Sequence, residues 1–333
     1  HGLPVELEVE KMLGLNGKEQ IEEYGMEPFI KKCKESVWKY KGMWEDFSGT
    51  VGFWADMENP YVTYDDNFIE SEWWALKQIW DKGLLYKGFK IVPYCPRCGT
   101  PLSSQEVAQG YKTVKERSAV VRFKVVGEDA YFLAWTTTPW TLPSNVALCV
   151  NPDETYCKVK AADGYTYYMA EALLDKVLGK LGNEEEGVKA YEVLETYTGK
   201  DLEYKEYEPL YACAAEVAAK QHKKGHFVTC DTYVTMSDGT GIVHIAPAFG
   251  EDGRKYDLPF VQFVNGKGEM TEETPYAGLF VKKADPEVLK DLDAQGKLFD
   301  APKFEHEYPH CWRCDTPLIY YARESWFIKM TAV

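Results

Sequence analysis

The chain has 333 residues, of which 45% are hydrophobic and 27% are charged, as in a globular protein with two or three domains and a substantial core. Its formal net charge of −15 argues against a general nucleic-acid coat protein, which would be basic. No apolar run approaches the ~18 residues that a membrane-spanning helix needs, and no signal peptide is visible. We therefore expect a cytoplasmic protein with no membrane partner.

The first part of the chain is expected to be helical. It begins without methionine, on "HGLPVELEVEK", and reads as a piece of a longer protein. The stretch "EEYGMEPFIKKCKESVWKYKGMWEDF" repeats apolar residues at intervals of three and four, which is typical of one face of a helix. A second helix is predicted at "DDNFIESEWWALKQIWDKG", where Asp65 or Asp66 caps its start and Gly83 ends it. We expect its tryptophans, Trp73 and Trp80 among them, to pack in a core.

The middle of the chain is expected to be rich in strands. "SAVVRFKVV" and "AYFLAWTTT" contain the β-branched and aromatic residues that favour strands. An Asp-Gly or Asn-Gly pair predicts a hairpin turn in each of three segments, residues 156–170, 233–246 and 260–271. Short helices are predicted between the strands at residues 170–182 and 285–298, and the carboxy-terminal "LIYYARESWFIKM" is again typical of a strand.

Two matched cysteine motifs predict a metal site. "CPRCGTPL", with Cys95 and Cys98, and "CWRCDTPL", with Cys311 and Cys314, share the pattern Cys-x-Arg-Cys-x-Thr-Pro-Leu. Each Cys-x-x-Cys turn can supply two thiolates, so the two motifs predict one closed, structural Zn²⁺ site with four cysteine ligands. A redox pair is the alternative, although two matched copies favour zinc. The other five cysteines are scattered, which indicates a reducing compartment rather than disulfides.

The positions of the motifs predict the domain organisation. They lie on either side of the strand-rich region, so we interpret that region as an insertion between the halves of a zinc ribbon. The predicted fold is α+β, with a helical region at residues 1–90, ribbon halves at 91–115 and 301–333, and a β-rich, barrel-like insert at 116–300.

The threonine run is a candidate binding site. In "AWTTTPWTLPSN" the strand must stop at Pro139 and again at Pro143, so Thr136–Thr138 fall at a strand end. Stiff side chains with both a methyl and a hydroxyl can define a small pocket in shape and polarity, although ordinary strand threonines are the alternative. His244 lies in an apolar strand, where a core histidine is the usual interpretation. No nucleophile elbow, Walker loop or dinucleotide-binding glycine motif is present.

Four stretches together resemble isoleucyl-tRNA synthetases, which are class I aminoacyl-tRNA synthetases. They are "WTTTPWTLPSN", "GTGIVHIAPAFGED", "YCPRCGTPLSS" and "HGLPVELEVEK", and the resemblance covers essentially the whole chain. It is specific, because the related valyl and leucyl enzymes carry Thr-Thr-Arg-Pro at the threonine run. The resemblance implies a helical remnant of the catalytic Rossmann domain, followed by a zinc ribbon with an inserted editing domain. The His-x-Gly-His and Lys-Met-Ser-Lys-Ser signatures are absent, so ATP and Mg²⁺ are expected only in the full-length parent enzyme.

The resemblance also implies an activity and the residues that perform it. The family's editing domain hydrolyses valine wrongly esterified to the isoleucine tRNA, so the expected partners are the tRNA(Ile) acceptor end and its valine ester, bound by a monomer. Water attacks the ester without a side-chain nucleophile. By similarity, the expected hydrolytic residues are Thr136, Thr137, Thr138, His244, which excludes isoleucine by size, and Asp252, and the expected substrate-binding residues are Thr141, Asn145, Trp140 and Tyr308, the last two seating the terminal adenosine.

One position departs from the family pattern. The family has an aspartate nine residues after the histidine, which holds the substrate's α-ammonium group, whereas nine residues after His244 stands Gly253. Three explanations are open. Asp252 takes this role in a shifted loop, or the aspartate is lost and editing with it. The third is that the protein contains additional residues at this point, which are missing from the printed sequence. We favour the third. Loss of hydrolysis would leave a non-catalytic, zinc-stapled docking module for the tRNA end, and a zinc hydrolase is a further alternative that needs an open metal position.

Overall fold

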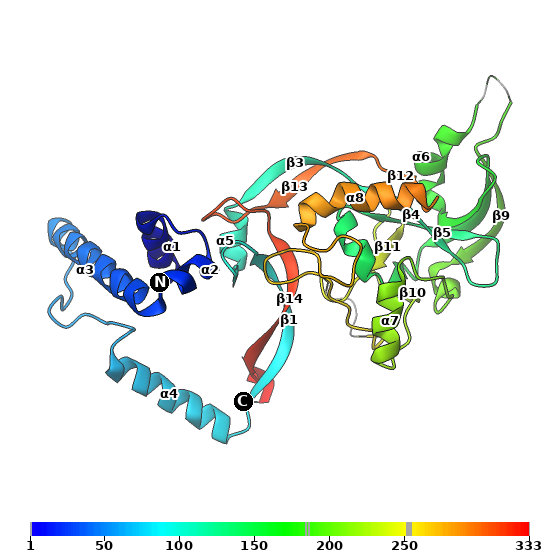
Figure 1. Cartoon of the computed structure of the whole chain (residues 1–333). Helices are drawn as coiled ribbons and strands as arrows, with labels where there is room; N and C mark the ends of the chain where they lie inside the picture. Colours follow the sequence, from blue (N-terminus) through cyan, green and yellow to red (C-terminus); the bar gives the residue numbers. More distant parts are fainter. Residues whose placement is uncertain (1, 184, 186, 251–254, 333) are drawn as a thin grey trace. The chain divides into compact units, whose positions relative to one another are not determined.

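The computed structural model describes residues 2–183, 185, 187–250 and 255–332 (Figure 1). Helices and strands are both well represented, which confirms the predicted α+β class. Within the described ranges, no helix is both long and apolar enough to cross a membrane.

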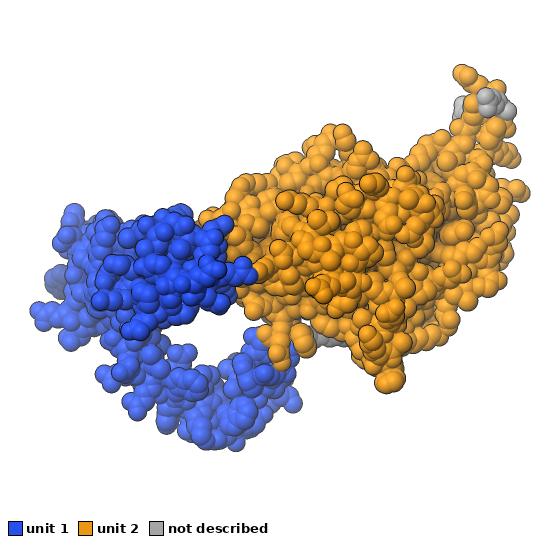
Figure 2. Space-filling view, viewed as in Figure 1, with its two compact units in different colours: residues 1–88, 325–333 blue, residues 89–324 orange. Residues whose placement is uncertain are grey.

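The chain divides into two compact units. One comprises residues 1–88 with 325–333, and the other comprises residues 89–324 (Figure 2). The predicted division into a helical region, two ribbon halves and a β-rich insert remains a prediction.

The first unit begins with three helices around a small core. Val9, Ile21 and Phe29 are its buried residues, so each of the three helices contributes one. The segment predicted as one helical stripe is divided at Gly25, whose φ of 107° is not helical and suits a residue without Cβ. The helices of this unit are α1 (Gly2–Leu13), α2 (Lys18–Tyr24), α3 (Met26–Thr50) and α4 (Asp66–Asp81), followed near the carboxy terminus by the 3-10 helix η6 (Met330–Ala332).

Helix α4 is the second predicted helix. Asp65 stands at its N-cap position, but its side chain makes no capping hydrogen bond, so the predicted cap is not formed. Gly83, with φ of 67°, lies just beyond the end of the helix. The prediction that its tryptophans pack in a core is wrong, because Trp73 and Trp80 are 69% and 54% exposed and no residue of α4 is buried. Helical periodicity predicts which residues share a face, but it does not show whether another element covers that face.

A small sheet carries the first cysteine motif, and a capped helix follows it. Strands β1 (Leu85–Cys95), β2 (Thr100–Pro101) and β14 (Ile319–Ile328) pair in the order β14-β1-β2, and β14 confirms the strand predicted near the carboxy terminus. Helix α5 (Ser104–Ala108) follows β2. It begins with a capping box, in which Ser103 and Glu106 each accept a hydrogen bond from the other's backbone N–H.

A two-stranded ribbon leads into and out of the β-rich region. Strands β3 (Tyr111–Arg117) and β13 (Lys303–Pro309) pair antiparallel along their full lengths and lie side by side in Figure 1. At the end of the ribbon, His310 N donates to Gly110 O at 2.8 Å. A Cβ on Gly110 would lie 1.8 Å from the carbonyl oxygen of His310, so only glycine permits this approach.

The β-rich region forms a nine-stranded sheet in the described part of the chain. Its strand order is β10-β6-β11-β5-β8-β7-β9, while β4 pairs with both β5 and β12. Fully buried aromatic side chains, including Phe123, Tyr156 and Tyr168, fill its core. The strands are β4 (Ala119–Lys124), β5 (Tyr131–Thr136), β6 (Ala147–Val150), β7 (Thr155–Ala161), β8 (Thr166–Ala170), β9 (Tyr191–Thr198), β10 (Phe227–Cys230), β11 (Ile242–Ile245) and β12 (Leu298–Asp300).

Short helices surround this sheet. The helices predicted at residues 170–182 and 285–298 are both present, the first as three short turns and the second as one helix that begins earlier than expected. They and the remaining helices are η1 (Pro139–Ser144), η2 (Glu171–Leu173), α6 (Leu174–Leu178), η3 (Gly179–Leu181), η4 (Gly199–Leu202), α7 (Ala212–Lys220) and α8 (Val281–Ala294).

The three predicted hairpins have different outcomes. The hairpin at residues 156–170 is confirmed as β7 and β8, which pair antiparallel. The hairpin at residues 233–246 is wrong, because β11 pairs with β5 and β6 instead. An alternating pattern identifies a strand, but it does not identify the partner of that strand. At residues 260–271 the chain turns back at the predicted place, with an isolated antiparallel bridge between Val264 and Met270 and a hydrogen bond of 2.9 Å from Asn265 N to Glu269 O, but no named strands form.

Strand β5 lies at the branch point of the sheet. It pairs antiparallel with β4 and parallel with both β8 and β11. Val243 of β11 is the partner of Trp135 of β5, so the residues that follow them, Thr136 and His244, lie near each other. Parallel pairing brings the carboxyl ends of two strands to the same edge of a sheet, and this edge carries the candidate site.

Replacement of Gly110 by alanine tests the close approach of the two chain segments. Gly110→Ala should lower the free energy of unfolding by on the order of 2 kcal/mol or more, because the new methyl group overlaps the His310 carbonyl. Gly179→Ala is the matched control, since Gly179 has a helical φ of −52° and no atom near its Cβ position. Thermal unfolding followed by circular dichroism measures both variants, and equal melting temperatures would contradict the prediction.

Candidate functional site

The threonine run lies where strand β5 ends. Thr136 is the last residue of β5 and Pro139 is the first residue of η1, as the predicted strand stop requires. Proline has no backbone N–H and therefore cannot continue the strand ladder. Thr138 directly precedes η1, and its carbonyl oxygen accepts a hydrogen bond from Thr141 N at 3.0 Å. The run is thus a tight turn between a strand and a 3-10 helix.

Four side chains form a hydrogen-bonded chain across this turn. Thr138 N donates to Thr136 Oγ1 at 3.1 Å, and the Oγ1 atoms of these residues are 3.3 Å apart. Thr138 Oγ1 is also 3.3 Å from Thr141 Oγ1. Thr141 Oγ1 in turn donates to the Thr138 carbonyl oxygen at 2.7 Å and lies 2.8 Å from His244 Nε2. The chain therefore connects β5 to β11 through η1.

His244 is a neutral member of this chain. Because the Thr141 hydroxyl donates to a carbonyl, the network assigns the ring proton to Nε2, which donates to Thr141 Oγ1. His244 Nδ1 is then an acceptor, and it is buried with no partner among the described residues. Burial lowers the pKa of His244 to about 4. An imidazole with so low a pKa is a weak general base at neutral pH, so its hydrogen bond and its bulk are what it offers the site.

These side chains line a small cavity of about 280 Å³. Its volume lies just below the range of about 300–1,000 Å³ that is typical of small-molecule pockets, which suits a small ligand group. The lining mixes hydroxyl groups with apolar surface. It consists of Trp135, Thr136, Thr137, Thr138, Thr141, Val243, His244, Ile245, Ala246, Phe249 and Gly250.

A second cavity, of about 290 Å³, adjoins the first. The two share Thr137, Thr138, Thr141 and Phe249, so the threonine turn forms part of both walls. The other lining residues are mainly aromatic or come from the ribbon, and they are Tyr111, Trp140, His306, Glu307, Tyr308, Pro309 and Tyr320. A ligand with a small polar end and a flat ring could occupy both cavities at once.

The structure thus brings Trp140 and Tyr308 to the same cavity. The Trp140 ring meets Phe249 edge to face at 4.9 Å, and its Nε1 is buried without a partner in the described part of the chain. Tyr308 Oη donates to the Leu318 carbonyl oxygen at 2.7 Å, which fixes the ring. Lys282 Nζ lies 4.1 Å from the centre of the same ring.

Two of the predicted site residues are not placed at these cavities. Asn145 is buried, and its side chain is used inside the protein: its Oδ1 accepts from Tyr207 Oη at 2.6 Å and its Nδ2 donates to Ala147 O at 2.9 Å. Asp252 lies outside the described residues, as does Gly253. The described wall of the first cavity extends to Gly250, the residue before that segment begins.

Asp285 is a neighbour of the site that sequence reasoning missed. Its Oδ1 accepts a hydrogen bond from Trp140 N at 2.9 Å, although the two residues are 145 positions apart. Burial raises its pKa to about 7, against smaller lowering effects of Lys282 and the Trp140 N–H. In sequence Asp285 is one of several acidic residues in a helix, and no motif distinguishes it.

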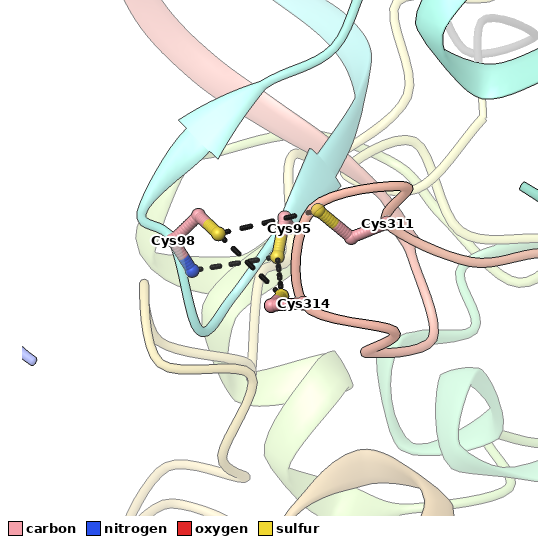
Figure 3. Close-up of side chains that lie close together, drawn as sticks. All are labelled: Cys95, Cys98, Cys311 and Cys314. Carbon is pink, nitrogen blue, oxygen red and sulfur yellow. Dashed lines mark hydrogen bonds between the residues drawn. The ribbon is translucent and has the colours of Figure 1, made fainter. Parts of the chain in front are cut away.

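The four motif cysteines meet at one point. Cys95, Cys98, Cys311 and Cys314 offer sulfur atoms that all lie within 4.8 Å of one another, and Figure 3 shows their side chains converging from two chain segments. Three of these residues are buried. Cys98 N also donates to Cys95 Sγ at 3.3 Å, within the turn that the first motif forms. Such a cluster could hold a metal ion.

The amino-acid sequence as a whole identifies the class of protein. The family described as "tRNA synthetases class I (I, L, M and V)" matches residues 1–333. The chain belongs to this family of class I tRNA synthetases. It is 57% identical to an isoleucine–tRNA ligase of Clostridium acetobutylicum and 50% identical to one of Bacillus thuringiensis, in both cases over its whole length. It spans 31% of the length of each of these relatives.

Solved structures of editing domains are also similar to the chain. The crystal structure of GlLeuRS-CP1 covers 56% of this chain and 99% of its own, with 14% identity and a TM-score of 0.44. The editing domain of the P. knowlesi cytosolic leucyl-tRNA synthetase covers 59% of this chain and 99% of its own, with 13% identity and a TM-score of 0.44.

The burial of His244 predicts an acid sensitivity. The folded-state pKa of about 4 lies below the unfolded value of 6.5, so between these pH values the unfolded chain binds the extra proton. The neutral His244 ring therefore costs no stability above pH 6.5, and the free energy of unfolding falls as the pH falls from 6.5 toward 4. In His244→Gln the melting temperature should therefore depend less on pH in this window. A midpoint near 6.5 for the imidazole of His244 by NMR would contradict the prediction.

Proposed function

We propose that this chain contains the hydrolytic editing site of an isoleucyl-tRNA synthetase, which removes valine wrongly attached to tRNA(Ile). The family membership and the identity to isoleucine–tRNA ligases support the assignment of the parent enzyme. The single observation that supports hydrolysis most directly is the cavity of about 280 Å³ lined by the threonine turn and His244. The expected substrate is the aminoacyl ester at the acceptor end of the tRNA.

The physical need for such a site is a limit on discrimination. A binding pocket distinguishes substrates that differ by one methylene only modestly, and the isoleucyl enzymes are themselves the standard example, at about 150-fold. A second site that admits valine and rejects isoleucine by size multiplies this selectivity. Threonine is suited to its wall, because its β-branched side chain is stiff at χ1 and its methyl and hydroxyl groups have fixed directions.

His244 supplies a second part of the size limit in this proposal. Its ring lines the cavity and is held by the hydrogen bond of 2.8 Å between Nε2 and Thr141 Oγ1. A ring that is neutral and fixed in this way can exclude one additional methylene without presenting a charge to an apolar side chain. The second cavity, with Trp140 and Tyr308, then receives the terminal adenosine.

Hydrolysis requires no covalent intermediate on the protein. Among the described residues, the cavity lining contains no cysteine, and the histidine beside its threonine hydroxyls is a weak base because its pKa is about 4. We infer that the hydroxyl chain holds a water near the ester carbonyl and stabilises the charge that develops on it. Asp252 is the candidate within the sequence for the group that holds the substrate's ammonium, and Asp252→Ala should abolish editing if it has this role.

The four-cysteine cluster is proposed to hold a structural zinc ion. Tetrahedral ligands at a zinc–sulfur distance of about 2.3 Å are about 3.8 Å from one another. The sulfur separations of 3.5 Å for Cys95 with Cys314 and 4.0 Å for Cys98 with Cys311 lie on either side of that value. Bound zinc would contribute to folding by joining the two motifs. Isoleucine activation with ATP and Mg²⁺ is proposed for the parent enzyme, as a cytoplasmic monomer.

Hydrolysis of the two charged tRNAs tests the proposed function. The chain should release valine from Val-tRNA(Ile) and leave Ile-tRNA(Ile) intact. Thr138→Ala and His244→Ala, which remove parts of the cavity wall, should lower the valine-to-isoleucine ratio of kcat/KM by about tenfold or more. Thr235→Ala is the control, because Thr235 is exposed and lines neither cavity.

Three results of this experiment would each lead to a different conclusion. Unchanged discrimination in both wall variants would contradict the size-exclusion role. Equal hydrolysis of both substrates by the unaltered chain would contradict editing. Absence of hydrolysis on tRNA and on a minimal valyl-adenosine ester would favour the non-catalytic docking module.

Metal analysis tests the zinc site. The chain should bind one zinc ion, and Cys98→Ser or Cys314→Ser should lose it, whereas Cys33→Ser should retain it because Cys33 lies outside the cluster. A chelator should lower the melting temperature, since the metal joins the two ends of the β-rich region. If chelation abolishes hydrolysis while the fold and its melting temperature stay unchanged, the metal is catalytic rather than structural.

A further inference from the structure

Asp285 makes a contact that the proposed mechanism does not use. It lies in the first turns of helix α8, which packs against η1. From there its carboxylate accepts the backbone N–H of Trp140, the residue that lies between the hydroxyl chain and the aromatic cavity. We propose that Asp285 is a positioning residue, which holds the threonine turn in its active shape through this hydrogen bond to the Trp140 N–H.

The same part of α8 fixes the opposite wall of the second cavity. Lys282, three residues before Asp285, donates from Nζ to Glu116 Oε2 of β3 at 2.6 Å. Its Nζ also lies above the ring of Tyr308 of β13. Two side chains of α8 therefore hold η1 and the β3–β13 ribbon, the elements that supply most of the second cavity's lining. A shift of α8 would change the spacing between these walls.

Charged and titratable groups face Asp285 from each of these elements. Lys282 is on its own helix and Glu116 is on β3, and these act on the carboxyl with opposite signs. Tyr308 faces it from β13, where His306 Nε2 also lies 3.8 Å from Glu116 Oε2. From η1 it receives only the Trp140 N–H. Burial outweighs Lys282 and the N–H, and the pKa of Asp285 is raised to about 7.

This arrangement costs stability above neutral pH. The unfolded carboxyl ionises near 3.8 and the folded one near 7, so between these values the folded state binds the extra proton. Stability therefore falls as the pH rises from 4 to 7. Among the described carboxyl groups with a resolved pKa shift, Asp285 is the one whose pKa is raised. A destabilising carboxylate beside a candidate site is expected where the charge serves function.

Ionisation changes how tightly the turn is held. A carboxylate accepts the Trp140 N–H in a charge-assisted hydrogen bond, which is about twice as strong as a neutral one. A protonated carboxyl still accepts the bond, but more weakly. Editing should therefore increase as the pH rises through about 7. Asparagine retains an acceptor oxygen and cannot ionise, so Asp285→Asn should have the activity of the protonated form at every pH. Asp285→Ala removes the acceptor.

An NMR titration tests the hydrogen bond between Asp285 and the Trp140 amide without measuring catalysis. Pro139-Trp140 is the only Pro-Trp pair in the sequence, so ¹³C-carbonyl proline and ¹⁵N-tryptophan labelling isolates the Trp140 amide. Its proton shift should titrate with a midpoint near 7 in the unaltered chain and should not titrate in Asp285→Asn. Glu116→Gln should lower the midpoint, and His306→Gln should leave a titration in place. A flat response from pH 5 to 9, or a titration that survives in Asp285→Asn, would overturn the proposal.

Hydrolysis of Val-tRNA(Ile) tests the positioning role, and this part rests on the proposed function. Asp285→Ala should lower kcat about fivefold or more at pH 8, Asp285→Asn should recover part of that loss, and its rate should not rise through pH 7. Equal rates for the alanine variant and the unaltered chain would overturn the positioning role. If the unaltered chain hydrolyses nothing while the Trp140 amide titrates as expected, the anchor is supported and the proposed function fails.

Discussion

The second unit depends on holding the two ends of its β-rich region together. The ribbon of β3 and β13, the hydrogen bond from His310 to Gly110 and the four clustered cysteines all act at this junction. Each joins residues that are about 190 or more positions apart, so each closes a long loop and restricts the conformations of the chain between them. Because Tyr308 is part of this ribbon and lines the second cavity, the junction also sets one wall of the candidate site.

The candidate site combines a fixed shape with little chemical reactivity. Parallel pairing of β5 and β11 brings Thr136 beside His244, and the hydroxyls of Thr138 and Thr141 connect them. Every polar contact in this chain fixes a side chain that also forms part of the wall. Because the imidazole of His244 is neutral at physiological pH, the described wall of the cavity carries no charge there. Such a site selects by size and position, which is what the proposed editing of an ester by water requires.

The sequence predicted local features better than long-range ones. The cysteine cluster followed from two copies of one motif, and the end of β5 followed from proline chemistry. The meeting of the threonines with His244 came from the family resemblance, because the alternating pattern of β11 does not specify its partners and suggested a wrong hairpin. Asp285 could not have been predicted, since its importance comes from one contact across 145 residues. The exposed Trp73 shows that helical periodicity predicts which residues share a face, but not whether another element packs against that face.

The separation of the cysteine motifs along the chain also determines when, during synthesis, the four thiols can first come together. Cys95 and Cys314 are 219 residues apart, so a ribosome that adds roughly 5–20 residues per second leaves the first pair waiting for about 10–40 s. The strands between them are synthesised within that interval, before the second pair of thiols exists. The cluster can close only after the second motif has been synthesised, so its closure comes after the synthesis of every strand of the nine-stranded sheet in the described part of the chain.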